Sequence, residues 1–342
     1  MTNNSVNNRI FYLDICRCFA TIAVIGFHVG SYGIARNILI VLTNWCVPIF
    51  ITITGALFLD FSKESPTYTL ILHRIIRLLR TLIFWGLFYN FVSLTIIERK
   101  LSFSTLIVSA KMVLSADTTF CYQFWYIYMI IGLYLLIPVL DKFIRYSQIR
   151  DVLTLLIITT FFSIILRTVS LVCSGTYDDT FWKSAFTCFS GFSSYLLLGY
   201  WLRTRSLTPK SLFVLCFTCI LQILIVIVTI ALNFNTFEYY TGYQSILTYE
   251  LTMLVIVASQ QMVPFVQKHP RLQKAIQYIS KESFGIFVFH VIILQMLRKL
   301  FGIDCTFAPQ PISIPLLITI VLFLSLLCTR IFKKFKFSTF IL

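Results

Sequence analysis

The chain has 342 residues, a net charge of +15 at pH 7 and a mean hydropathy of +0.87; hydrophobic residues make up 58% of it and charged residues only 12%. This composition excludes an ordinary soluble domain and indicates a polytopic membrane protein. The positive charges occur in short clusters between apolar segments rather than in one basic patch, so we interpret them as topology signals and expect no nucleic-acid partner.

The sequence has no long linker, low-complexity tract or internal repeat, and we therefore predict a single membrane domain over residues 1–342 without a separate soluble domain. The polar residues 1–8 precede no cleavage site, so the first helix is expected to remain as an uncleaved anchor. The ten cysteines are scattered, mostly within apolar runs, and we expect free thiols with no metal site and no bound cofactor.

The first apolar run, from Ile10 to Ser31, carries three ionisable residues on one side. A helix advances about 100° and 1.5 Å per residue, so Arg17 and His28 lie within about 20° of one another and about 16.5 Å apart. Asp14 is close enough to pair with Arg17 on the same stripe. Because ionisable groups are costly at membrane depth, this arrangement favours a functional site that faces a cavity. The alternative is an interfacial ion pair and a polar histidine near the far interface.

Ten runs are long enough to cross a hydrocarbon core of about 30 Å, which takes about 20 residues. They fall near 10–31, 38–59, 81–97, 124–140, 152–172, 185–202, 212–232, 244–263, 284–300 and 314–331. The apolar stretch 101–118 is a candidate surface or re-entrant helix, so nine or eleven spans also fit the pattern. The predicted fold is an all-α membrane helix bundle.

The distribution of basic residues predicts the orientation of this bundle. If the N-terminus lies inside, the cytoplasmic segments carry nineteen of the 28 lysines and arginines and the opposite segments carry seven. By the positive-inside rule, both termini are therefore predicted to be cytoplasmic.

The cytoplasmic segment after the second predicted helix has an arginine at every third position, namely Arg74, Arg77 and Arg80. Guanidinium groups bind phosphate in a bidentate manner, so this ridge is a candidate site for the phosphates of a cytosolic nucleotide-bearing donor. Juxtamembrane arginines also fix topology and contact anionic lipid head groups, which is the alternative interpretation.

Four further residues are candidates for the cavity or for an acceptor site. Trp125 begins the fourth predicted helix, where tryptophan is also typical of an interfacial belt, and His290 in the ninth helix could instead be a satisfied polar contact. Arg167 and Glu250 fall at the same depth in the outer third of the membrane. We predict that they pair across the cavity, with a purely structural bridge as the alternative.

Together these motifs resemble the acyltransferase-3 family, integral-membrane O-acyltransferases of which many modify bacterial surface polysaccharides. The resemblance spans the first to the ninth predicted helix and rests on Tyr12-Leu-Asp14-x-x-Arg17 followed by His28, Val47-Pro48-Ile-Phe-Ile-Thr-Ile-Thr54-Gly55, the arginine ridge, Phe124-Trp125-Tyr126 and Ser283-Phe-Gly285-Ile-Phe-x-x-His290.

The resemblance implies a ten-helix fold in the bacterial cytoplasmic (inner) membrane, with acyl-CoA, in particular acetyl-CoA, used from the cytoplasm. The implied acceptor is a sugar hydroxyl of a surface or lipid-linked polysaccharide such as O-antigen. The family's first-helix arginine and histidine map onto Arg17 and His28, and its cytoplasmic arginines map less closely onto the ridge. Two departures are Thr54, where family members often have serine, and the lack of a large fused esterase-like domain.

The chemistry agrees with these residue types. A thioester is already activated, so transfer to an alcohol needs mainly a base and correct placement. We predict His28 as the base, Arg17 as the group that stabilises charge or places the donor, and Asp14 as the group that orients Arg17. A covalent acyl-histidine step is an alternative route. The alternative function is a transporter or flippase of a lipid-linked sugar, which would act without acyl-CoA.

Overall fold

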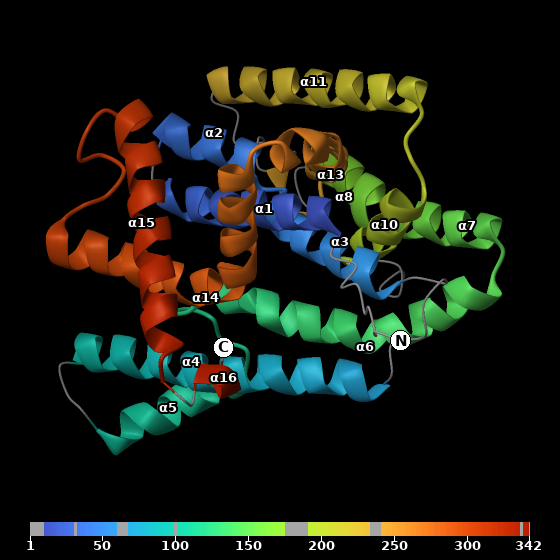
Figure 1. Cartoon of the computed structure of the whole chain (residues 1–342). Helices are drawn as coiled ribbons and strands as arrows, with labels where there is room; N and C mark the ends of the chain where they lie inside the picture. Colours follow the sequence, from blue (N-terminus) through green and yellow to red (C-terminus); the bar gives the residue numbers. More distant parts are fainter. Residues whose placement is uncertain are drawn as a thin grey trace.

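The computed structural model describes residues 10–30, 33–59, 68–98, 102–174, 191–232, 241–335 and 338–341. All regular secondary structure in these residues is helical (Figure 1). Nine helical stretches among them are long and apolar enough to cross a membrane. The predicted all-α, multi-pass membrane bundle is therefore confirmed.

The helices follow the predicted order along the chain. They are α1 (Phe11–Val29), α2 (Gly33–Thr43), α3 (Cys46–Phe58), α4 (Tyr68–Glu98), α5 (Phe103–Leu114), the 3-10 helix η1 (Tyr122–Phe124), α6 (Trp125–Tyr146), α7 (Ile149–Thr160), the π-helix η2 (Phe161–Ile165), α8 (Leu166–Ser174), α10 (Ser193–Thr204), α11 (Pro209–Ala231), α13 (Ile246–Gln267), α14 (Pro270–Phe301), α15 (Gln310–Phe332) and α16 (Ser338–Ile341).

Three predicted segments differ in detail from the observed helices. The run 38–59 is divided between α2, which ends at Thr43, and α3, which begins at Cys46. Pro48 explains the break, because it has no N–H to donate and its ring would clash with the carbonyl group of Asn44 in a continuous helix. The arginine ridge is part of α4, which begins at Tyr68 rather than near residue 81. The predicted span 185–202 lies partly outside the described residues, and its described portion belongs to the twelve-residue α10.

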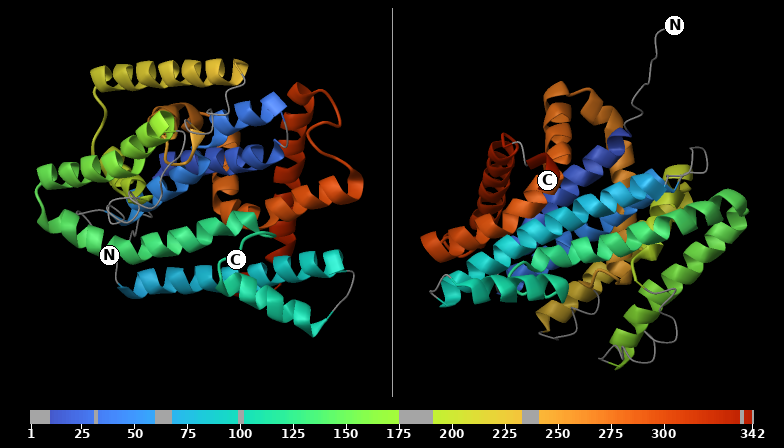
Figure 2. Two further views of the ribbon diagram at one scale, coloured as in Figure 1. Left: turned by 180° about the vertical axis from the view of Figure 1, so that it is seen from behind. Right: turned by 90° about the horizontal axis from the view of Figure 1, so that it is seen from below.

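Helix α1 lies at the centre of the bundle and packs against α3, α13, α14 and α15 (Figures 1 and 2). Helices α3 and α10 cross with their backbones in direct contact. A Cβ atom on Gly55 would overlap the backbone of Leu196, and one on Gly199 would overlap the backbone of Thr52. This close crossing fixes α10 against α3, and α3 in turn packs against α1.

Helix α14 changes direction part-way along its length, so that its two halves contact different sides of the bundle (Figures 1 and 2). The Tyr89 hydroxyl donates to the Val288 carbonyl at 2.7 Å and accepts from the Ile292 N–H at 3.2 Å. These two backbone groups are partners in a regular helix, and a side chain inserted between them is a known cause of bending. His290 lies in the turn that Tyr89 contacts.

Candidate active site

The cluster at the start of α1 joins that helix to α14. The Ser280 hydroxyl donates to Asp14 Oδ1 at 2.7 Å, and Arg17 Nη1 lies 3.3 Å from the Ser280 oxygen and 3.7 Å from Asp14 Oδ1. Asp14 is buried, whereas the Arg17 side chain keeps 27% of its surface exposed. The predicted Asp14–Arg17 pair is therefore present, and it leaves the guanidinium facing a cavity.

That cavity, which we call the basic cavity, has a volume of about 330 Å³. Its lining includes Arg17 from α1, Arg74 and Arg77 from α4, and Lys281 from α14. The Arg74 guanidinium lies 4.7 Å from the centre of the Phe58 ring and that of Arg77 lies 5.6 Å from the Phe284 ring. The remaining lining residues are Leu78, Tyr134, Ser280 and Ser283. Arg80 is exposed and does not line this cavity, so the ridge contributes two of its three arginines.

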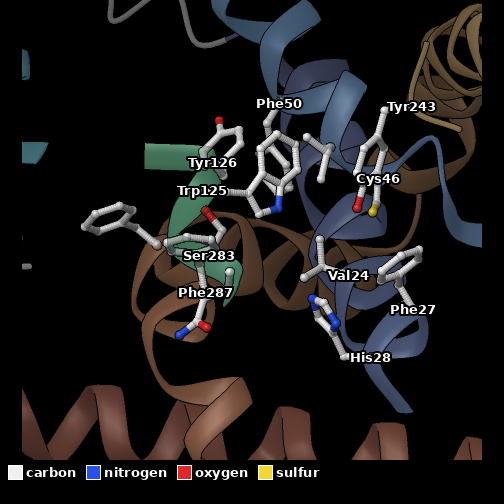
Figure 3. A pocket seen from close by; sticks show the side chains of 13 residues that line it. Val24, Phe27, His28, Cys46, Phe50, Trp125, Tyr126, Tyr243, Ser283 and Phe287 are labelled. Carbon is white, nitrogen blue, oxygen red and sulfur yellow. The ribbon is translucent and has the colours of Figure 1, made fainter. Parts of the chain in front are cut away.

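A second cavity, of about 110 Å³, surrounds His28 and is called the histidine cavity below (Figure 3). Figure 3 shows His28 on α1 facing Trp125 and Tyr126 from α6 and Ser283 and Phe287 from α14. The other lining residues are Val24, Phe27, Cys46, Val47, Phe50, Gln123, Tyr243 and Phe284. In the described chain, no protein group is hydrogen-bonded to the His28 ring, which is partly exposed to the cavity. Its nitrogens are therefore available to a substrate.

A second histidine lies directly against the first. The rings of His28 and His290 have centroids 5.3 Å apart, and the Tyr122 ring lies 5.0 Å from that of His28. His290 Nδ1 lies 2.8 Å from the Phe287 carbonyl and 3.1 Å from the Ile286 carbonyl. A carbonyl oxygen only accepts hydrogen bonds, so Nδ1 carries the hydrogen and Nε2 is an acceptor. This Nε2 is buried without a hydrogen-bond partner among the described residues.

The far end of α1 is fixed by Arg298 from α14. Its Nη2 donates to the carbonyl oxygens of His28 at 2.8 Å and Val29 at 3.0 Å. These carbonyls end the helix and have no partner within it, and a cation there also interacts favourably with the helix dipole. The position of the His28 backbone therefore depends on Arg298.

The two cavities share part of their walls. Ser283 and Phe284, both on α14, line the basic cavity and the histidine cavity. The arginines and His28 therefore lie on either side of the same short segment of α14. The prediction that Arg17 and His28 share one face is consistent with this arrangement, because α14 packs along α1. Ser280 of α14 lies beside Asp14 and Arg17, and His290 of α14 lies beside His28.

The predicted pairing of Arg167 with Glu250 is wrong. Glu250 accepts hydrogen bonds from Thr218 Oγ1 at 3.0 Å and Gln222 Nε2 at 2.7 Å, both on α11. Arg167 Nη1 donates instead to Gln244 Oε1. Equal depth in the membrane does not fix the direction of a side chain, and Glu250 faces α11, at one edge of the molecule in Figure 1, rather than the histidine cavity.

Comparison with protein families decides the class of this site. Residues 10–331 match the family model described as an acyltransferase domain, which is the family that the motifs resemble. The chain belongs to this acyltransferase family. No curated protein and no solved structure matches it. This acyltransferase is a multi-pass membrane protein, and the match covers the helices that form both cavities.

Several residues of the acyltransferase site are not predicted from the sequence. Ser280, Ser283 and Phe284 lie in or beside the quoted motif of the ninth predicted helix, but serine and phenylalanine are ordinary residues in a membrane helix. Arg298 is one of the seven lysines and arginines that the sequence places opposite the cytoplasmic side, and only the structure brings it to the end of α1. Tyr243 precedes α13 and lines the histidine cavity, and burial raises the pKa of its hydroxyl above the usual range.

Proposed function

We propose that this acyltransferase moves an acetyl group from cytosolic acetyl-CoA to a hydroxyl group of a surface or lipid-linked polysaccharide, such as O-antigen, at the bacterial cytoplasmic membrane. The observation that carries the proposal is the pair of neighbouring cavities, one lined by arginines and one by His28, which have Ser283 and Phe284 as common wall residues.

The basic cavity fits the charged end of the donor. Coenzyme A carries phosphate groups at one end and its thioester at the far end of a long flexible arm. Arg74, Arg77 and Arg17 offer planar guanidinium groups for the phosphates, and the Asp14–Arg17–Ser280 cluster holds one of them in place. In this proposal Arg17 places the donor, because it lines the basic cavity and not the histidine cavity.

The histidine cavity fits a small acyl group. Its volume is about 110 Å³ and most of its walls are aromatic or aliphatic, as suits the methyl group and thioester of acetyl-CoA. An apolar cavity also limits water, which competes with the sugar hydroxyl for the acyl group.

The reaction needs two proton transfers, both of which pass through His28. A ring nitrogen of His28 removes the proton of the acceptor hydroxyl as its oxygen attacks the thioester carbonyl carbon. The carbon–oxygen bond forms, the carbon–sulfur bond breaks, and the leaving thiolate takes the proton from His28. The ring of His290 lies beside that of His28, with centroids 5.3 Å apart, and borders the base on the side of α14.

Labelled acetyl-CoA tests the proposal in membranes that contain the protein and its natural glycan. We expect label on the glycan, and no label above background with His28→Ala at equal abundance. If the glycan crosses the membrane but gains no label from any acyl-CoA, the transporter function is supported instead.

A further inference from the structure

Gln123 is the residue of the histidine cavity with the least evident structural role. It lies in η1, directly before α6, and is only 3% exposed. Its side chain lines the cavity, and neither Oε1 nor Nε2 has a hydrogen bond of normal geometry to the described residues. The Tyr89 hydroxyl lies near the carboxamide but already donates to Val288 and accepts from Ile292. Buried carboxamides are normally paired, because leaving both ends unpaired destabilises the fold. A ligand in the cavity that forms a hydrogen bond with this carboxamide would remove that cost.

The neighbours of Gln123 are held firmly. The Tyr122 ring lies 5.0 Å from the His28 ring, and Phe124, which is fully buried, packs edge-on against Tyr89 at 5.5 Å. Before them, the Cys121 thiol donates to Asn90 Oδ1 at 3.7 Å. A polar group fixed in this way needs little reorganisation when charge develops beside it, which is the requirement for electrostatic stabilisation of a transition state.

We infer that the Gln123 carboxamide binds the carbonyl oxygen of the acyl thioester and stabilises the negative charge that develops on it. This inference rests on the proposed acyl transfer. When the acceptor oxygen attacks the carbonyl carbon, the π electron pair moves to the carbonyl oxygen, and an N–H of Gln123 Nε2 donates to that oxyanion. When the carbon–sulfur bond breaks, the pair returns to re-form the carbonyl, and the new ester leaves.

Gln123 suits this role better than Arg17, His28 or Ser283. Arg17 lines the basic cavity only, and His28 acts on the proton of the acceptor. Ser283 lies where the two cavities meet, so the arm of the donor passes beside it. Glutamine side chains are among the usual donors of oxyanion sites.

The test compares two coenzyme A analogues that differ in the carbonyl group. One is the ketone in which a methylene replaces the thioester sulfur, and the other is S-ethyl-CoA, a thioether of similar size without the oxygen. The purified protein should bind the ketone more tightly than the thioether. Gln123→Met keeps the length of the side chain but cannot donate, so it should bind both analogues equally. Its kcat should fall by about 100- to 1,000-fold with the acetyl-CoA KM changed little.

Gln260→Met is the matched control, because Gln260 Nε2 donates to the Leu202 carbonyl at 3.0 Å and lines neither cavity. This variant should keep the preference for the ketone. If Gln123→Met does not accumulate, Gln123→Leu gives the second measurement, since leucine is of similar bulk and donates no hydrogen bond. It should also lose the preference.

The outcomes separate the two proposals. A wild-type protein that binds neither analogue and transfers no label from acetyl-CoA would contradict the proposed function itself. A protein that transfers acetyl but whose Gln123→Met or Gln123→Leu variant still prefers the ketone would overturn the role of Gln123 alone. Equal kcat values for the wild-type and Gln123→Met proteins would overturn it as well.

Discussion

Arg298→Met should displace His28 without weakening the binding of the donor. Arg298 Nη2 donates to the carbonyl oxygens of His28 and Val29, at 2.8 and 3.0 Å. Hydrogen bonds from a charged group contribute about 1.5 to 3 kcal/mol each, so loss of both weakens the last turn of α1 by about 3 to 6 kcal/mol at most. This is enough to release the turn that carries the His28 ring.

The expected consequence is a fall in kcat. A displacement of about 1 Å at a reacting group can cost about 100-fold in rate, so we expect a decrease of about 10- to 100-fold. The acetyl-CoA KM should stay near the wild-type value, because the basic cavity lies at the opposite end of α1 from Arg298.

Steady-state kinetics of the purified protein at varied acetyl-CoA give both constants, and protein abundance is measured in parallel. Arg298→Lys keeps the charge but not the planar group, and should recover part of kcat. A well-folded Arg298→Met protein with the wild-type kcat, or with a raised KM and unchanged kcat, would refute this reasoning.

Three other predictions follow from the same contacts. His28→Ala should lower acyl transfer by about 100- to 10,000-fold at normal abundance, measured as label moved from acetyl-CoA, because a positioned base is lost. Arg74→Gln and Arg77→Gln should each raise the acetyl-CoA KM by about 10-fold and the acceptor KM much less, because one phosphate contact of about 1.4 kcal/mol is lost. Lysine at either position should restore little of the affinity, because it lacks the planar group of arginine. Glu250→Ala should lower the free energy of unfolding by about 1 to 3 kcal/mol without a large change in kcat, because the hydrogen bonds between α13 and α11 are lost.

The predictions for the arginines and for Glu250 have controls within the chain. Arg80→Gln is the control for the arginines, since Arg80 lies on the same helix but does not line the basic cavity. An equal rise in donor KM for Arg80→Gln would indicate a diffuse charge effect rather than a phosphate site. For Glu250, a double-mutant cycle should show coupling of about 0.5 kcal/mol or more with Gln222 and additive effects with Arg167. Coupling to Arg167 alone would contradict the observed partners.

The fold class follows from sequence because each membrane helix must satisfy its backbone hydrogen bonds internally and must present an apolar surface of sufficient length. The division of 38–59 could have been inferred from Pro48, whose effect on the preceding turn is local. The length of α4 could not, because its first turns carry charges and the helix continues beyond the apolar run. The bend of α14 depends on Tyr89, which is far away in the sequence.

The site is predictable to the extent that it lies on one helix. The spacing of Asp14, Arg17 and His28 is a property of α1 itself, and the Asp14–Arg17 pair is present. The partners of these residues come from α14, and periodicity within one helix does not specify the register of the next. The same limit explains the error at Arg167 and Glu250. The sequence indicates how deep in the membrane each residue lies, but it does not indicate which neighbouring helix each side chain faces.

Photolabelling tests the central claim, that a donor held in the basic cavity presents its acyl group to His28. An acyl-CoA with a small diazirine on the acyl group is bound, irradiated and mapped by peptide sequencing. Label should fall on peptides that line the histidine cavity, such as those containing Val24, Trp125 or Phe287, and an excess of acetyl-CoA should abolish it. The Arg74→Gln, Arg77→Gln double variant should lose the label. Labelling that is confined to helices outside both cavities, or that persists in this double variant, would contradict the account.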